Sequence, residues 1–159
     1  MEIKGEAVMS QLSSYRDGEI INSVNLKRQI IYQKNINLEN FYDAVTAIRF
    51  NECIMFTIPC AFSITKFIPN LTVLEIINSK LSKITSEDLE GFDCLRDLFI
   101  YSCEIEYLPG DLFMYTPKLE FVSFFNNKIK YIDEGILDPL ENLKAIDLSC
   151  NVNIDVLYN

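Results

Sequence analysis

The sequence of 159 residues contains no histidine. Histidine is the usual general base of enzymes, the partner of nucleophilic serine and cysteine, and the commonest metal ligand in proteins. The chain also has only five glycines, and it contains no CxxC, P-loop or GxGxxG motif. We therefore predict that the protein is not an enzyme, with no catalytic residue, no metal site and no cofactor.

One group of carboxylates is a candidate for acid–base chemistry. Asp88, Glu90 and Asp93 lie close together in the sequence. Acid–base catalysis also needs a substrate pocket and a second functional group, and neither is indicated nearby. We interpret these residues as a solvated surface on the outer side of the fold.

The net charge is -9, and the isoelectric point is near 4.5. Nucleic acids and anionic lipids bind cationic surfaces, so neither is predicted as a partner. A basic partner is compatible with this charge, although solubility alone also explains it.

Long apolar runs are absent as well. The longest weakly polar stretch, residues 53–65, is too short to span a bilayer.

What the sequence does contain is a repeat. Copies with a period of 24 residues open at Leu71, Leu95, Leu119 and Leu143. In the copy from Leu119, apolar residues occupy positions 1, 4, 6, 11, 14, 19 and 22, and Asn127 occupies position 9. This is the spacing of a leucine-rich repeat. An earlier copy opens at Val45, 26 residues before Leu71. A single copy cannot bury its apolar edge, so the copies must stack on one another.

The predicted fold class is therefore α/β, a leucine-rich repeat solenoid. We expect a curved parallel β-sheet on the concave face and irregular or short helical returns on the convex face. The expected strands are residues 47–50, 73–76, 97–100, 121–124 and 145–148. The expected helical pieces are residues 86–91, 111–115 and 134–140.

The extent of the repeat divides the chain into two regions. Residues 1–44 form an N-terminal leader and cap, with strands expected at 19–26 and 29–33, and residues 1–17 are expected to be flexible. Residues 45–159 form the repeat domain, with about five repeats. The last repeat ends soon after Asn151. We expect a chain truncated at this end, the alternative being a short tail that acts as a minimal cap.

The five cysteines are distributed irregularly. Cys53 and Cys103 both occupy position 9, where a buried thiol can replace asparagine as a weak donor. They belong to repeats two apart, so they should lie about 10 Å from each other, beyond the reach of a disulfide. An odd count fits a reducing compartment, or a fragment that lacks one partner cysteine.

Function in a solenoid of this kind is expected on the exposed side chains of the concave strands. Aromatic and aliphatic residues there form an apolar patch with charged neighbours, which is the composition of an interface centre. The alternative is that the aromatic residues only stabilise neighbouring strands. The candidate partner-binding residues are Arg49, Glu75, Ile77, Asp97, Phe99, Tyr101, Phe121 and Phe125.

The segment from Leu71 to Leu148 resembles the extracellular type of leucine-rich repeat protein. Secreted repeat proteins of insects, chiefly dipterans, contain short sequence segments similar to residues 67–74, 111–113, 117–119, 127–129 and 137–140. The resemblance implies a horseshoe-shaped protein that is secreted or on the cell surface and binds other proteins in recognition, adhesion or signalling. No cysteine precedes Cys53 and no secretory leader is evident. A cytoplasmic location is therefore the alternative.

The sequence thus predicts a non-catalytic protein–protein interaction module that binds a protein partner on its concave face, in recognition or signalling. A homodimer is compatible with this prediction, whereas nucleic-acid binding and direct membrane insertion are not predicted. The alternative function is a structural spacer within a longer receptor ectodomain.

Overall fold

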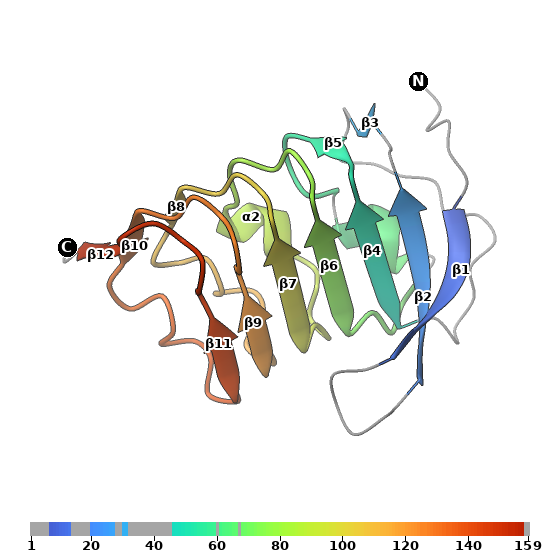
Figure 1. Ribbon diagram of the computed structural model, residues 1–159. Helices are drawn as coiled ribbons and strands as arrows, with labels where there is room; N and C mark the ends of the chain where they lie inside the picture. The colour runs from blue at the N-terminus through green and yellow to red at the C-terminus, as the bar shows by residue number, and fades with distance from the viewer. Residues whose placement is uncertain are drawn as a thin grey trace.

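The computed structural model describes residues 7–13, 20–27, 30–31, 46–59, 61–66 and 68–157. Its main feature is a seven-stranded sheet in the order β1-β2-β4-β6-β7-β9-β11, whose strands lie side by side across the molecule (Figure 1). From β2 onward all neighbouring strands are parallel. The strands are β1 (Ala7–Ser13), β2 (Ile20–Lys27), β4 (Ala47–Asn51), β6 (Val73–Ile77), β7 (Asp97–Tyr101), β9 (Phe121–Ser123) and β11 (Ala145–Asp147). The five strands expected in the repeats are confirmed, each to within one residue at its end.

Shorter strands follow the turns that end the main strands. β8 (Tyr107–Leu108), β10 (Tyr131–Asp133) and β12 (Asp155–Leu157) form a parallel three-stranded sheet, and β3 (Ile30–Ile31) pairs with β5 (Ile54–Met55). The turns that contain β4, β7, β9 and β11 therefore each contribute to two sheets, and the solenoid is held together on more than one side.

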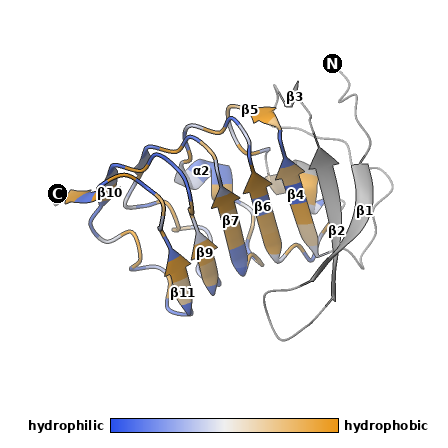
Figure 2. Cartoon of the chain, in the orientation of Figure 1, coloured by the Kyte–Doolittle hydropathy of each residue, from blue (hydrophilic) through white to orange (hydrophobic). Residues whose placement is uncertain are grey.

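The core lies between the seven-stranded sheet and the returning chain. Leu95, Leu98 and Ile100 in one turn, like Leu119 and Phe124 in the next, are completely buried. Figure 2 shows that hydrophobic residues dominate the main strands β6, β7 and β9. The last turn is less covered, because Leu143, Ile146, Leu148 and Ile154 are only partly buried against the same core. The stacking that the repeat pattern predicts is thus complete in the middle turns and partial in the last.

The residue at position 9 closes each turn on the inside. The amide of Asn127 donates to Ile100 O at 2.7 Å and to Phe124 O at 3.1 Å, and its Oδ1 accepts from Ile105 N at 3.2 Å. Where asparagine is replaced, a thiol or hydroxyl makes fewer bonds: Cys103 Sγ lies 3.3 Å from Tyr101 O, and Ser79 Oγ donates to Ile77 O at 2.9 Å. The expected role of the buried thiols is confirmed for Cys103.

The N-terminal part of the structure extends the repeat register. β2 lies parallel to β4, with Val24 opposite Ile48 and Leu26 opposite Phe50, just as Ile48 lies opposite Leu74. The expected strands near 19–26 and 29–33 correspond to β2 and β3. For residues 7–13, which we expected to be flexible, the structure has a strand, β1, antiparallel to β2. The rest of the expected flexible segment, residues 1–6 and 14–17, lies outside the described residues.

Among the described residues, two helices lie on the returning side, α1 (Ala61–Thr65) and α2 (Ser86–Leu89). The start of α2 is fixed by Asp88, whose carboxylate accepts from Thr85 N at 3.0 Å. Asp88 is therefore buried, which corrects our interpretation of it as solvated surface, whereas Glu90 and Asp93 are exposed. The helix expected at 86–91 is thus confirmed in shorter form.

The helical pieces expected at 111–115 and 134–140 are wrong. Both segments are turns closed by backbone hydrogen bonds three residues apart, such as Met114 N to Asp111 O at 3.0 Å and Asp138 N to Gly135 O at 2.9 Å. Pro117 and Pro139 have no backbone N–H and disfavour a helix in the residue before them. Gly135 also has a φ of +77°, which a helix does not accommodate.

Candidate functional site

The concave side of the sheet places the predicted binding residues in adjacent strands. In the parallel register, Glu75 lies opposite Phe99, Ile77 opposite Tyr101, and Asp97 opposite Phe121. The pairing continues past the strand ends, because Ser102 N donates to Phe125 O at 3.1 Å and Asn78 N donates to Tyr101 O at 3.0 Å. Hydrogen bonds of the main chain therefore set the spacing of the candidate residues.

Five of these residues form what we call the concave aromatic patch: Ile77, Phe99, Tyr101, Phe121 and Phe125. Phe125 is 37% exposed, and the other four are half-buried. The rings of Phe99 and Tyr101 stack at 5.5 Å between centroids, with an angle of 21° between their planes. Lys144 lies 5.9 Å from the centre of the Phe121 ring. The patch thus consists of apolar side chains on adjacent strands that still reach solvent.

The predicted charged residues lie differently from our expectation. Glu75 and Asp97 are 3% and 8% exposed, so they are not the open rim that the sequence suggested. Glu75 accepts a hydrogen bond from Nε of Arg49, one turn earlier, at 2.5 Å. A buried carboxylate needs such a partner. The ion pair therefore has a structural role on the N-terminal side of the patch. Arg49 itself is half-buried.

A second group of charges on the same sheet was missed by the sequence reasoning. Glu120 is 8% exposed and lies between two cations from the neighbouring turns. Its carboxylate accepts from Arg96 Nε at 2.6 Å and pairs with Lys144 Nζ at 2.6 Å. The sequence does carry a signal, since the three residues all occupy position 2 of successive repeats. The cations beside the patch are thereby neutralised.

Asp147 is the exposed carboxylate at the C-terminal side of the patch. It accepts hydrogen bonds from Ser149 Oγ at 2.5 Å and from Ser149 N at 2.9 Å. These bonds stabilise the ionised form, so the pKa of Asp147 is lowered from its ordinary value. Asp147 therefore presents a negative charge in the strand next to the patch, where it lies opposite Ser123.

The strands β4, β6, β7, β9 and β11 each lead into a residue with a left-handed backbone at position 8 of the repeat. The φ angles of these residues lie between +51° and +59°, in the series Glu52, Asn78, Ser102, Asn126 and Cys150. For a residue with a side chain this region is unfavourable by about 1–2 kcal/mol. Its recurrence in five turns shows that the stacked backbone imposes it, and that the rim of the concave face has one fixed geometry.

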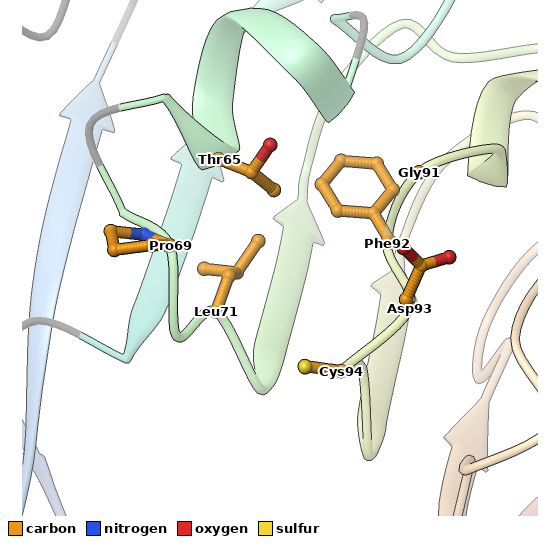
Figure 3. A pocket seen from close by; sticks show the side chains of 7 residues that line it. All are labelled: Thr65, Pro69, Leu71, Gly91, Phe92, Asp93 and Cys94. Atoms are coloured by element: carbon orange, nitrogen blue, oxygen red, sulfur yellow. The ribbon is translucent and has the colours of Figure 1, made fainter.

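A pocket of about 290 Å³ lies on the returning side, between the turn that follows α1 and the turn that follows α2. In Figure 3 the side chains of Thr65, Leu71, Phe92 and Cys94 border a common space. Leu71 and Phe92 belong to the buried core, whereas Cys94 is an exposed free thiol. The Thr65 hydroxyl donates to Ala61 O at 2.9 Å. These groups do not converge on a point, so the pocket gives no argument for a ligand.

Three further features of the described part of the chain bear on its chemistry. No group of three or more histidine, cysteine, aspartate or glutamate residues there could hold a metal ion. No helix within the described ranges is long and apolar enough to cross a membrane. Cys53 and Cys103 are buried free thiols, and Cys94 and Cys150 are exposed free thiols. Cys60 lies outside the described residues.

The chain matches no protein-family model. A segment of 91 residues is 35% identical to keratocan from Gallus gallus and equally to keratocan from Coturnix japonica. This match covers 54% of the chain and spans 25% of the length of each keratocan. Among solved structures, the leucine-rich repeat ectodomain of the receptor kinase SOBIR1 from Arabidopsis thaliana is similar, with a TM-score of 0.56 and 18% identity. That likeness covers 94% of this chain and 82% of the ectodomain.

The likeness to the SOBIR1 ectodomain concerns the fold, since the sequences share few residues. Together with the parallel sheet and the repeated turns, it confirms the predicted leucine-rich repeat solenoid, with less helix than we expected. The similar proteins named above come from birds and a plant. The insect grouping and the secreted or cell-surface location remain predictions.

Proposed function

We propose that the chain is a non-catalytic protein-interaction module, and that the concave aromatic patch binds a protein partner in recognition or signalling. The supporting observation is that this patch reaches solvent on the seven-stranded sheet, although the residues next to it in the sequence are completely buried: Ile76, Leu98, Ile100 and Phe124. Aromatic residues on a fixed backbone lose little entropy on binding and are enriched at interface centres.

The charges around the patch also support this function. Arg49 is engaged by Glu75, and Arg96 and Lys144 are engaged by Glu120. A partner that covers these pairs would bury charges that already have a partner, which costs less than burying the same charges unpaired. The similar fold in a receptor ectodomain fits a role in which the solenoid presents a surface to another protein.

A structural spacer is the second candidate function. The stacking of Phe99 on Tyr101 favours it, because cross-strand and same-strand aromatic contacts stabilise a sheet without any partner. In that role the exposed part of the patch would have no binding function, and replacing its outermost residues would affect nothing except stability.

The decisive experiment first identifies partners by proximity labelling in the native cells. Isothermal titration calorimetry then measures the dissociation constant of the chain for each purified partner. The variant Tyr101→Ala/Phe125→Ala should weaken binding at least about 30-fold, since two interface-centre aromatics contribute about 1 kcal/mol or more each. Met114→Ala, at a 51% exposed residue outside the patch, is the matched control and should bind like the wild type. Equal binding of all three proteins would favour the spacer.

A further inference from the structure

The three-stranded sheet of β8, β10 and β12 has an outer surface that the concave proposal does not involve. Tyr107, Tyr131 and Asp155 lie opposite one another in its parallel register. Tyr107 and Tyr131 are 42% and 45% exposed, whereas the next residues, Leu108 and Ile132, are 1% and 7% exposed and face the core. The alternation of a strand thus places both tyrosine rings and one carboxylate on the same outward face.

A second row lies beside these three residues. Asp133 in β10 is opposite Leu157 in β12, and Leu157 is 40% exposed. Neighbouring parallel strands are about 4.8 Å apart, so the aromatic and acidic residues of the two rows lie on three strands that together span about 10 Å. We call this surface the tyrosine face, and define it as Tyr107, Tyr131, Asp133, Asp155 and Leu157. Figure 1 shows its three strands along one edge of the solenoid, apart from β7, β9 and β11.

Hydrogen bonds fix one side of the tyrosine face in place. The hydroxyl of Tyr107 donates to Asp133 Oδ2, which also accepts from Gly110 N at 3.2 Å. The nearby carboxylate disfavours ionisation of the phenol, and the pKa of Tyr107 is raised accordingly. The Tyr107 ring is therefore held before any ligand arrives, which lowers the entropic cost of binding.

The charges near the tyrosine face leave it acidic. The closest lysines in sequence are already paired, Lys128 with Glu104 at 3.2 Å and Lys130 with Glu106 at 3.1 Å. Within the ranges that the structure describes, Asp133 and Asp155 form no ion pair with a lysine or arginine. An incoming cation would thus find two carboxylates whose charge is not neutralised.

We propose that the tyrosine face binds an arginine-bearing segment of a partner protein. A guanidinium group is planar, stacks on an aromatic ring and pairs with a carboxylate through two N–H donors, whereas a lysine ammonium does neither as well. Stacked on Tyr131, it would lie beside Asp155 in the adjacent strand. A second copy of this chain fits poorly, because each copy carries a net charge of -9 and the two would repel.

The test uses a minimal probe and the intact chain. Acetyl-Gly-Arg-Gly-amide is titrated at low salt into the isotope-labelled protein, and backbone amide shifts are followed by NMR. The same tripeptide with citrulline, which has the shape of arginine without its charge, is the ligand control. Saturable shifts centred on residues 131–133 and 155–157 are expected with arginine, and much weaker ones with citrulline.

Variants separate the stacking from the charge pairing. Asp155→Asn and Tyr131→Ala should each raise the dissociation constant about two- to fivefold, as expected for an exposed ion pair and an exposed cation–π contact. Tyr131→Phe keeps the ring and should bind like the wild type. Asp147→Asn removes the same charge from the concave sheet and should also leave binding unchanged.

Three results would overturn the proposal: no saturable shift at these amides, equal responses to arginine and citrulline, or equal losses in Asp155→Asn and Asp147→Asn. Shifts confined to the concave sheet would likewise place the arginine elsewhere. All four variants replace exposed side chains, and unchanged spectra away from the site would show that they fold. The result is independent of partner binding by the concave aromatic patch.

Discussion

The side-chain amide of Asn127 donates to the carbonyl oxygen of Ile100, one turn earlier, at 2.7 Å. The same side chain bonds to Phe124 O in its own turn and accepts from Ile105 N. Asn127 is 7% exposed, so these backbone groups have no access to water. One side chain thus satisfies the polar groups of two successive turns, where main-chain pairing cannot reach.

Replacing this asparagine should therefore be costly. Asn127→Ala leaves buried carbonyl and N–H groups without partners, so we expect the free energy of unfolding to fall by about 2–3 kcal/mol. Urea denaturation followed by circular dichroism measures the change. Asn142→Ala is the control, because that exposed residue makes only a long bond of 3.4 Å to Pro117 O, and it should cost less than about 0.5 kcal/mol. Similar losses in both variants would contradict this role.

The buried thiol that replaces asparagine in the preceding turn should make stability depend on pH. Burial raises the pKa of Cys103 from 9.0 to about 11. The unfolded chain therefore loses this proton first, so the stability contributed by the neutral thiol is complete below pH 9 and falls as the pH rises toward 11. By pH 11 the wild type should have lost about 2 kcal/mol more than Cys103→Ala does over the same range.

Urea denaturation of both proteins at several pH values between 8 and 11 provides this comparison, since other titrating groups are common to the two. Cys53→Ala is a useful second variant, because Cys53 is a buried thiol at the same repeat position. If wild type and Cys103→Ala follow parallel pH profiles, the thiol is not held neutral by its surroundings.

Much of the fold could be predicted because the repeat is visible in the apolar residues. The apolar residues at positions 1, 4 and 6 place the strands to within one residue. The strand expected at 19–26 could also have been assigned to a further copy of the repeat, since Ile21, Val24 and Leu26 precede Val45, Ile48 and Phe50 by 24 residues. Polar residues later in that copy concealed it. Nothing in the local sequence indicates that β1 pairs in the antiparallel direction.

The sequence predicted where the candidate binding residues lie in the sheet, but it did not predict which of their side chains are buried. The register places Ile77, Tyr101 and Phe125 next to one another, as the repeat spacing requires. Whether a side chain on that face is exposed depends on neighbours from other turns. Glu75 is covered because Arg49 lies across it, and this follows from packing that the sequence alone does not give. The tyrosine face was missed because two- and three-residue strands give almost no periodic signal.

The last prediction concerns the difference between the middle and the end of the solenoid. Leu119 and Leu143 occupy the same position in successive repeats, but Leu119 is completely buried and Leu143 is half-buried. Leu119→Ala should lower the free energy of unfolding by about 2–5 kcal/mol, the usual cost of a cavity in a packed core. Leu143→Ala removes less contact area and should cost about 1 kcal/mol.

Leu98→Ala, in a turn with neighbours on both sides, should match Leu119→Ala and serves as the internal control. Hydrogen exchange adds a second measurement, because a turn packed on one side opens more readily than its neighbours. Amides of β11 should therefore exchange faster than those of β7. Equal costs for the three leucines, together with uniform exchange along the sheet, would mean that the last turn is packed as firmly as the middle ones and that the solenoid unfolds as one unit.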